Sequence, residues 1–393
     1  MGKVGIMLTL SAKNNTCWDE EPFIARVTTN INYPLPLRSN EALLIKEAID
    51  SLPEGFKSYI TTNIELGKNL FLKNKALIKL SEEFNYLSDG DIFKYIPRNG
   101  AIKILYRTDA RPNFFLLTER CNNYCLMCSQ PPRDINDGYI VDEILSTIPL
   151  MSRTTKEIVL TGGEPTLLKN DLLKIIRKLK SYLPETAVHI LSNGRLFSYL
   201  SLARDIAAIE HFDLMIGIPL YSDISNIHDF VVQGDGAFDE TIRGIINLKR
   251  YNVPVEIRVV LHKATYERLP QLARFITRNL PFVDHVALMG LEMTGFTKPN
   301  INALWIDPVD YQEQLVAAVD TLDRAAIRTS IYNHQLCLLN KKLWKFNVKS
   351  ISDWKNEYMP ECTGCIEKEQ CGGFFSSAHF KYSSKITPFL AKV

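Results

Sequence analysis

The chain has 393 residues, of which 46% are apolar and 23% are charged, an ordinary composition for a globular protein of two or three domains. Its formal net charge of +2 produces no broad basic field, so nucleic acid and anionic membrane are not favoured as partners. The sequence contains no run of about eighteen apolar residues, and its first ten residues lack the cleavage site of a signal peptide. These features predict a cytoplasmic protein without a membrane span.

Residues 1–112 show no regular alternation of strands and helices. Strand-like runs at Phe23–Thr28, Tyr59–Ile64 and Ile102–Tyr106 are interleaved with helical periodicity at Ala42–Ile49 and Lys75–Phe84. This mixture predicts a small N-terminal α+β domain, and nothing in the pattern indicates its role.

From residue 113 onward, short apolar runs alternate with stretches of helical periodicity, which predicts β-α units on a parallel sheet covered on both faces. We expect strands at Phe114–Glu119, Glu157–Thr161, Val188–Ser192, Leu214–Leu220, Val255–His262 and Val283–Gly290. We expect helices at Asp142–Ile148, Asp171–Tyr182, Leu200–Ile209, Phe238–Tyr251 and Leu269–Leu280, then a helix capped by Asp307 that runs through Ile327. Six units curl a sheet without the closure that eight would give. The predicted fold is α/β, with a partial (β/α)6 barrel at 113–300 and a C-terminal domain at 301–393.

Three cysteines, Cys121, Cys125 and Cys128, follow the first predicted strand in the spacing Cys-x3-Cys-x2-Cys. They therefore lie at the carboxyl edge of the sheet, where parallel sheets bind ligands. Cysteines at this spacing can hold an iron–sulfur cluster. Iron–sulfur clusters that only carry electrons are usually held by four cysteines, so three thiolates leave one iron of the cluster open to a small molecule. Because cytosolic thiols stay reduced, seven cysteines in two groups indicate metal and not disulfides, and Cys17 is left alone as an inert thiol.

Two further turns are predicted at the same edge of the sheet. The second strand ends in Gly162-Gly163-Glu164-Pro165, where two glycines allow a close approach of the backbone to a ligand and a carboxylate stands at the lip. The third strand ends in Ser192-Asn193-Gly194, which is small and polar. Either turn alone is common in proteins, but together with the cysteine loop they predict a binding site.

These motifs resemble those of the radical S-adenosylmethionine (SAM) superfamily over about residues 113–300. The resemblance implies that Cys121, Cys125 and Cys128 bind a [4Fe-4S] cluster whose free iron is chelated by SAM. An electron from the cluster would then break the sulfonium C–S bond and release a 5′-deoxyadenosyl radical. A low-potential donor, flavodoxin or ferredoxin, is the implied source of that electron. The cofactor-binding residues that the resemblance implies are Met127 against the adenine, Gly162, Gly163, Glu164 and Pro165 at the SAM ammonium, and Ser192 and Asn193 at the methionine or ribose portion.

Three later positions leave alternatives open. Arg258 lies in the middle of a predicted strand, and it either contacts the SAM carboxylate or ribose, as in similar enzymes, or forms an ion pair with Glu256. Many relatives carry a ribose-binding serine where this chain has Pro219, so that contact would come from elsewhere, such as Ser222. His228-Asp229 resembles a pair found in the peptide-modifying branch, but a helix cap is the favoured interpretation.

A second cysteine group lies near the C-terminus. Cys362, Cys365 and Cys371 have the spacing Cys-x2-Cys-x5-Cys, and Cys337 supplies a fourth thiolate. Four ligands close a site, and zinc would accept the same set. The group resembles half of a SPASM extension, or the shorter twitch domain with one cluster. That resemblance implies an auxiliary [4Fe-4S] cluster that accepts the electron left after hydrogen abstraction.

Segments 283–296, 332–337, 352–358 and 371–377 resemble the His-Xaa-Ser system radical SAM maturase family, HxsC. This implies a precursor peptide with His-Xaa-Ser repeats as substrate and a second radical SAM protein, HxsB, as partner. His334 and Asp353 either line a substrate cavity or pack loops. Two other functions stay open. One is cofactor or small-molecule synthesis of the molybdopterin-cyclase kind, with a second cluster held by three cysteines, and the other is a non-catalytic iron–sulfur or zinc protein.

Overall fold

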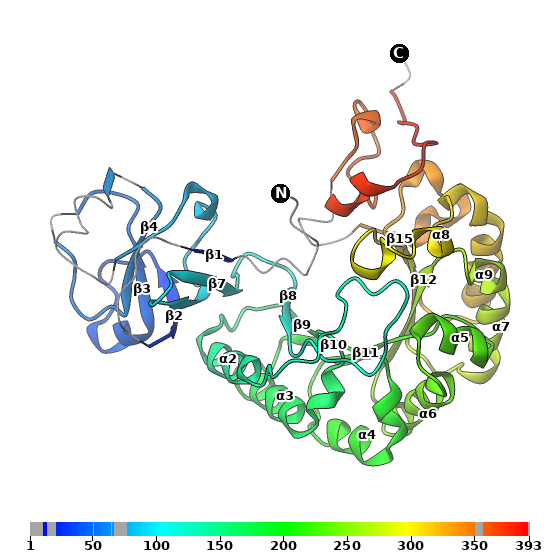
Figure 1. The fold of residues 1–393 in the computed structure, drawn as a ribbon, viewed down its shortest axis with the longest axis horizontal. Helices are drawn as coiled ribbons and strands as arrows, with labels where there is room; N and C mark the ends of the chain where they lie inside the picture. Colours follow the sequence, from blue (N-terminus) through cyan, green and yellow to red (C-terminus); the bar gives the residue numbers. More distant parts are fainter. Residues whose placement is uncertain are drawn as a thin grey trace.

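The computed structural model describes residues 11–13, 21–49, 51–63, 65–66, 77–349 and 357–391. Two sheets organise the described residues, one with seven strands between residues 11 and 106 and one with eight strands between residues 113 and 348. Figure 1 shows the first sheet at the left and the second, curled sheet at the right, with the C-terminal segment in orange and red above it.

The first sheet has the strand order β1-β7-β6-β2-β3-β4-β5. Its strands are β1 (Ser11–Lys13), β2 (Phe23–Thr28), β3 (Glu41–Leu44), β4 (Ser58–Thr61), β5 (Leu77–Lys79), β6 (Ile92–Ile96) and β7 (Ala101–Tyr106). The helices predicted at Ala42–Ile49 and Lys75–Phe84 are wrong, because β3, β5 and the 3-10 turn Glu82–Phe84 occupy these stretches. All four residues of β3 are buried. Periodicity alone does not separate such a short apolar run from a buried helical segment.

The second sheet is parallel throughout, in the order β15-β14-β13-β12-β11-β10-β9-β8. The six predicted strands appear as β8 (Asn113–Leu116), β9 (Glu157–Thr161), β10 (Ala187–Leu191), β11 (Leu214–Pro219), β12 (Val255–Leu261) and β13 (His285–Gly290). Two short strands, β14 (Thr329–Tyr332) and β15 (Asn347–Val348), extend it. Since β8 and β15 are the two ends of the sheet, the barrel is open, as predicted.

The predicted helices are present within a few residues of their expected bounds. They are α2 (Tyr139–Thr147), α3 (Asn170–Tyr182), α4 (Leu200–Ala207), α6 (Ala237–Arg250), α7 (Leu269–Asn279) and α9 (Gln312–Arg324). Two short helices, α5 (Ser225–Val232) and α8 (Ile301–Leu304), were not predicted. The helix expected from Asp307 is divided into a 3-10 turn, Pro308–Tyr311, and α9. Asp307 caps this turn as predicted, since its Oδ1 accepts the N–H of Val309 at 3.2 Å.

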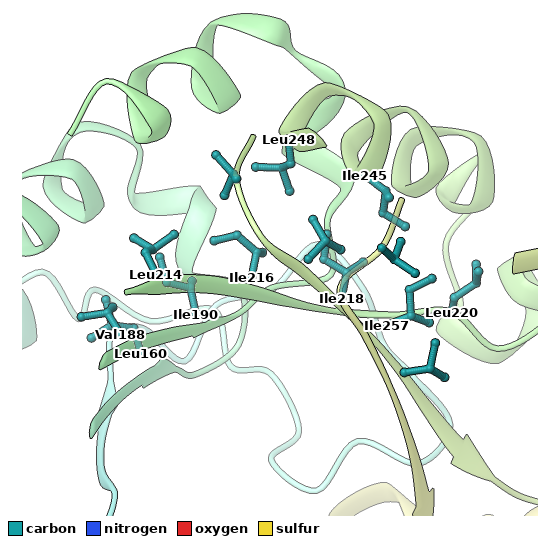
Figure 2. Close-up of a cluster of buried hydrophobic side chains, with 14 of the residues drawn as sticks. Leu160, Val188, Ile190, Leu214, Ile216, Ile218, Leu220, Ile245, Leu248 and Ile257 are labelled. Atoms are coloured by element: carbon teal, nitrogen blue, oxygen red, sulfur yellow. The ribbon is translucent and has the colours of Figure 1, made fainter. Parts of the chain in front are cut away.

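The main core lies between the second sheet and its helices. Figure 2 shows alternate side chains of β9 to β12, such as Ile190, Ile216 and Ile257, directed toward Ile245 and Leu248 of α6. Each such buried side chain contributes about 1.5–3 kcal/mol. In β12, Glu256 and Arg258 alternate with the core residues, and Glu256 is buried, so this face of the strand is covered as predicted but not apolar. The concave face of the sheet is therefore partly polar.

Polar contacts join the two sheets. Lys94 and Lys103, on adjacent strands of the first sheet, both form ion pairs with Glu143 of α2. The buried hydroxyls of Tyr106 and Thr155 are 2.8 Å apart. Within the part of the chain that the structure describes, no helix has both the length and the apolar character needed to cross a bilayer.

Candidate functional site

The three clustered cysteines lie in the loop after β8, and the backbone of this loop is held on two sides. On one side, the N–H of Leu126 donates to the carbonyl of Val231 in the last turn of α5 at 2.9 Å. On the other side, Asn300 Nδ2 donates to the carbonyl of Leu126 at 2.9 Å, and the N–H of Phe296 donates to the carbonyl of Cys128 at 2.8 Å. These contacts with α5 and with residues 296–300, which are distant in sequence, therefore fix the conformation of the loop.

The side chains of Cys121, Cys125 and Cys128 are free thiols and influence one another's ionisation. Burial raises the pKa of Cys121 to about 12, and the charges of Glu164 and Cys128 add to the effect. Burial and the two neighbouring thiols raise the pKa of Cys125 as well. Burial also raises the pKa of Cys128. Thiolates at this position require a compensating positive charge, which bound metal supplies.

The two glycines of the second turn allow β9 to end directly against the base of this loop. A side-chain carbon at Gly162, where φ is +140°, would lie 2.4 Å from the carbonyl oxygen of Thr118. One at Gly163 would lie 2.1 Å from the carbonyl oxygen of Arg120. The N–H of Gly163 donates to Thr118 O at 2.7 Å, and that of Glu164 donates to Arg120 O at 2.8 Å. Backbone groups of the turn and the cysteine loop thus fix each other.

Glu164 is fully buried, and protein donors occupy its carboxylate. Its Oε1 accepts from the N–H of Thr166 (2.9 Å), the hydroxyl of Thr166 (2.5 Å) and the hydroxyl of Ser192 (2.8 Å). Its Oε2 accepts from the N–H of Asn193 at 2.6 Å. Burial raises the pKa of Glu164, although these hydrogen bonds oppose the rise. Glu164 caps the 3-10 turn that begins at Pro165 and joins the ends of β9 and β10. Of the two oxygens, Oε2 keeps the greater capacity for a further donor.

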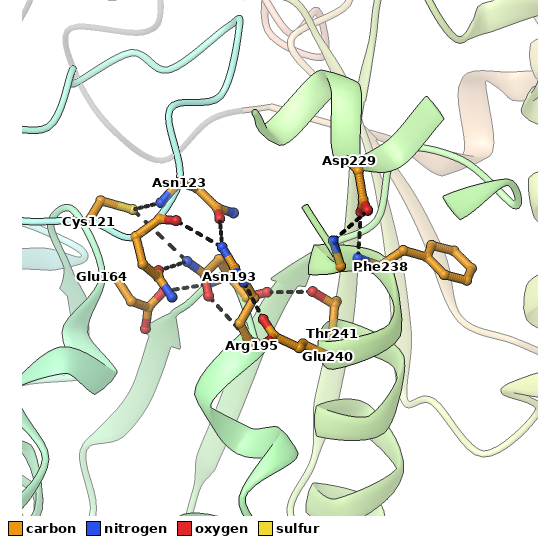
Figure 3. Close-up of polar contacts among 12 residues, drawn as sticks. Cys121, Asn123, Glu164, Asn193, Arg195, Asp229, Phe238, Glu240 and Thr241 are labelled. Atoms are coloured by element: carbon orange, nitrogen blue, oxygen red, sulfur yellow. Dashed lines mark hydrogen bonds and ion pairs between the residues drawn. The ribbon is translucent and has the colours of Figure 1, made fainter. Parts of the chain in front are cut away.

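Asn193 and Arg195 connect the end of β10 to the cysteine loop (Figure 3). Asn193 Nδ2 donates to Asn122 Oδ1 at 2.6 Å. Arg195 Nη1 donates to Asn123 Oδ1 at 2.7 Å, and its Nε donates to Glu240 Oε2 at 2.5 Å. Sequence reasoning missed Arg195, although its position just after the Ser192-Asn193-Gly194 turn, at the ligand-binding edge, was an available signal.

The His228-Asp229 pair has a structural role. Asp229 accepts the N–H groups of Gly236 (2.8 Å) and Phe238 (2.7 Å) at the start of α6, which confirms the helix-cap interpretation. His228 is buried, and its Nδ1 accepts the N–H of Tyr221 at 3.2 Å. The pair therefore positions α6 and Tyr221.

Tyr221 is the polar side chain that follows β11 at the loop. It lies in an apolar cluster with Met127, and its pKa is raised well above the usual range by burial and by the thiolate charges of the loop, against the effect of Arg258. Tyr221 thus packs beside the cysteine loop, in one cluster with Cys125. Ser222 is fully buried, and its hydroxyl oxygen accepts a backbone N–H two residues later at 3.1 Å, so this hydroxyl is used within its own turn.

The sequence of residues 115–276 matches the model of the radical SAM superfamily. The chain carries a radical SAM domain. Members of this superfamily are enzymes, and the matched stretch runs from β8 into α7. It therefore contains the cysteine loop, both polar turns and Arg258.

Curated relatives of the radical SAM domain include a probable GTP 3′,8-cyclase of Pyrococcus horikoshii, 28% identical over 149 residues, which are 37% of this chain and 46% of that protein. A probable GTP 3′,8-cyclase of Thermococcus kodakarensis is 24% identical over 150 residues, with the same coverage. This chain thus spans about half the length of the curated relatives that it matches.

Two solved structures are similar over parts of the chain. SuiB of Streptococcus suis, bound to S-adenosylmethionine, covers 65% of this chain and 56% of its own, with 15% identity and a TM-score of 0.47. The structure of anSMEcpe with bound AdoMet covers 56% of this chain and 62% of its own, with 16% identity and a TM-score of 0.45.

Within the radical SAM domain, Arg258 forms the predicted ion pair. Its Nη1 donates to Glu256 Oε1 at 2.6 Å, and its Nη2 donates to the sulfur of Met289 at 3.3 Å. A contact between Arg258 and SAM stays a prediction.

The second cysteine group follows the radical SAM domain. Cys337 lies after β14, and the other three thiols, Cys362, Cys365 and Cys371, lie in the C-terminal segment. Burial raises the pKa of both Cys337 and Cys362, and the thiols of the group raise it further in each case. The N–H of Leu336 approaches the sulfur of Cys371 at 3.5 Å. The structure thus brings together four thiols that are 34 residues apart in sequence at their extremes, Cys337 and Cys371.

The side chains of both groups are free thiols, which iron–sulfur clusters take as ligands and which zinc also accepts. Cys17 and Asp353 lie outside the described residues. His334 packs a loop, since its Nε2 is 2.8 Å from the hydroxyl of Tyr311.

Proposed function

We propose that this chain is a radical SAM enzyme that cleaves SAM reductively at a [4Fe-4S] cluster held by Cys121, Cys125 and Cys128. The observation that carries the proposal is the loop of three free cysteines after β8, at the carboxyl edge of the radical SAM domain. When bound, the cluster supplies the electron that opens SAM to a 5′-deoxyadenosyl radical, which removes a hydrogen atom from an unactivated C–H bond. The turns at Gly163 and Asn193 hold the loop in place for this chemistry.

The proposed substrate is a ribosomally made precursor peptide of the His-Xaa-Ser type. The sequence segments that resemble HxsC support this choice, and so does a cleft beside the second cysteine group. One wall includes Leu291, which packs in the cluster with Cys125, and the other includes Phe374, which packs with Cys337 and Cys362. Other residues of the cleft are Gly290, Trp305, Phe375 and Tyr382. A peptide in this cleft would therefore lie beside the apolar clusters that contain Cys125 and Cys337.

The second group, Cys337, Cys362, Cys365 and Cys371, would hold an auxiliary [4Fe-4S] cluster. Four protein thiolates leave no open iron, so its role in the proposal is to take the electron that remains after hydrogen abstraction. That role suits a net oxidation, such as cross-link formation. The proposed partners are a flavodoxin or ferredoxin as electron donor and an HxsB-like second radical SAM protein.

Co-expression of the chain with a His-Xaa-Ser precursor peptide, followed by mass spectrometry of the peptide, tests this function. We expect a mass loss of about two hydrogens, because a cross-link between two residues removes one hydrogen from each. The matched control is co-expression of the Cys125→Ala variant with the same peptide. A peptide of unchanged mass with both proteins would contradict a role in peptide maturation.

The curated relatives favour a second candidate, an enzyme of cofactor synthesis related to GTP 3′,8-cyclases. The two functions differ in the ligation of the second cluster, by four cysteines in the first case and by three in the second. Under the peptide-maturase proposal, we expect the Cys337→Ser variant to lose its second cluster, and the iron content to fall from about eight to about four per chain. Iron analysis with the Cys17→Ser variant as control measures this. Retention of about eight irons, with no zinc, would favour the cyclase-like alternative.

A further inference from the structure

A chain of hydrogen bonds crosses three strands on the concave face of the half-barrel. Glu256 of β12 accepts from Arg258 Nη1 at 2.6 Å through its Oε1, and its Oε2 is 2.6 Å from His285 Nδ1 on β13. His285 Nε2 is in turn 2.9 Å from the hydroxyl of Ser330 on β14. His189 of β10 joins from the other side, with its Nε2 at 3.7 Å from Glu256 Oε1. We refer to these five residues as the interior network.

The interior network lowers the stability of the fold if its role is only structural. Glu256 is 4% exposed, and buried charges lower stability unless they are paired and hydrogen-bonded. Burial alone would raise the pKa of Glu256, but the hydrogen bond with His285 and the charge of Arg258 outweigh it and lower the pKa to about 2. The carboxylate therefore stays ionised and holds Arg258 firmly. Apolar side chains would fill the same space at less cost, so the arrangement is better explained by recognition than by stability.

Two members of the network keep unused hydrogen-bonding capacity. Arg258 has five N–H donors, and besides Glu256 its bonded partner is the sulfur of Met289, which is a weak acceptor. Nε2 of His189 is buried without a hydrogen-bond partner. Strand β11, which lies between them, has no side chain at Gly217. A side-chain carbon there would lie 2.8 Å from His189 Nε2 and 3.0 Å from Arg258 Cδ. Both groups therefore meet over β11 on the concave face.

We propose that Arg258 and His189 bind a carboxylate of the substrate, and that Glu256, His285 and Ser330 are positioning residues that hold Arg258 for this task. The planar guanidinium fork matches a carboxylate in a bidentate pair. Burial lowers the pKa of His189 to about 4, so its ring is neutral and donates an ordinary hydrogen bond. The inference rests on the proposed function, because it names the chemistry of the group that the substrate presents.

The site lies close to the cysteine loop. Leu220 donates its N–H to the carbonyl of Arg258 at 3.1 Å, and Tyr221, the next residue, packs in one apolar cluster with Cys125 and Met127. A substrate anchored at Arg258 by an acidic side chain, or by its own C-terminal carboxylate, would therefore present neighbouring C–H bonds toward the loop.

Binding of two small probes to the reconstituted protein tests the inference. The probes are N-acetyl-aspartate N-methylamide and its isosteric asparagine analogue, and calorimetry measures both affinities. We expect the wild-type protein to bind the aspartate probe about tenfold more tightly, and both Arg258→Gln and Arg258→Lys to abolish this preference. Glu256→Gln should reduce the preference for the aspartate probe about threefold, because the Arg258 guanidinium loses the carboxylate that holds it in place. The exposed Arg278→Gln variant is the matched control, and circular dichroism verifies folding.

SAM and decarboxylated SAM distinguish the two sources of a carboxylate. If Arg258→Gln weakens SAM about tenfold but leaves decarboxylated SAM unchanged, Arg258 serves the cofactor and the inference is overturned. Equal binding of both probes by wild-type and variant proteins overturns it as well. A wild-type protein that prefers the aspartate probe but does not cleave SAM supports the carboxylate site while contradicting the proposed function.

Discussion

Replacement of Cys125 by alanine should abolish the reductive cleavage of SAM to 5′-deoxyadenosine. Cys125 is the central thiol of the loop, between Cys121 and Cys128. The two remaining thiolates do not retain the cluster, and the three cysteines act as a unit. We therefore expect the rate of SAM cleavage to fall about 1,000-fold or more. Chromatography of the products after anaerobic reconstitution and reduction with dithionite measures the loss.

The control for this experiment is Cys17→Ala, which removes a thiol outside both groups and should leave cleavage unchanged. Iron analysis should show that the Cys125→Ala variant retains about four of about eight irons, because the second group is intact. Unaltered cleavage by the Cys125→Ala variant would sink the assignment of the loop as the site of SAM cleavage.

Replacement of Gly163 by alanine should destabilise the radical SAM domain by about 3 kcal/mol or more. The added carbon would lie 2.1 Å from the carbonyl oxygen of Arg120, and its three nearest neighbours are all backbone atoms of Glu119 and Arg120, so no flexible side chain can move aside. Any shift that relieves this contact also displaces Glu164, whose N–H donates to the same carbonyl. We therefore expect the Gly163→Ala variant both to unfold at a lower urea concentration and to cleave SAM more slowly.

Gly138→Ala is the matched control for the change at Gly163. Its added carbon has Asn136 Oδ1 as nearest neighbour, at 3.9 Å, and Gly138 has helical dihedral angles before α2. A substitution there should change the free energy of unfolding by less than about 1 kcal/mol. If the two variants unfold at the same urea concentration, the close approach at Gly163 is not a constraint on the fold.

The parallel sheet could be predicted because each strand and helix has its own local pattern. The apolar runs at 157–161 and 255–261 appear as β9 and β12, and the three cysteines lie at the edge where parallel sheets bind ligands. Local pattern was misleading where a run is short and buried on both faces, as in β3, which overlaps the start of the helix predicted at Ala42–Ile49.

The contacts of the site residues depend on register, which no local pattern contains. Glu164 was predicted at the lip of a binding site, but its hydrogen bonds to Ser192 and Asn193 depend on β9 and β10 being neighbours. Similarly, Glu256 meets His285 because these two residues are paired across β12 and β13. Long-range pairing of this kind requires the assembled sheet.

Helix α5 ends where the cysteine loop passes, and this changes how both are stabilised. The last carbonyls of a helix have no partner within the helix. Those of Val231 and Val232 accept the N–H groups of Leu126 and Tyr124, which belong to the loop. The loop thus acts as the C-terminal cap of α5, and the helix in turn keeps the loop amides from exchanging with solvent. Metal binding that makes the loop more rigid would therefore also make α5 more rigid.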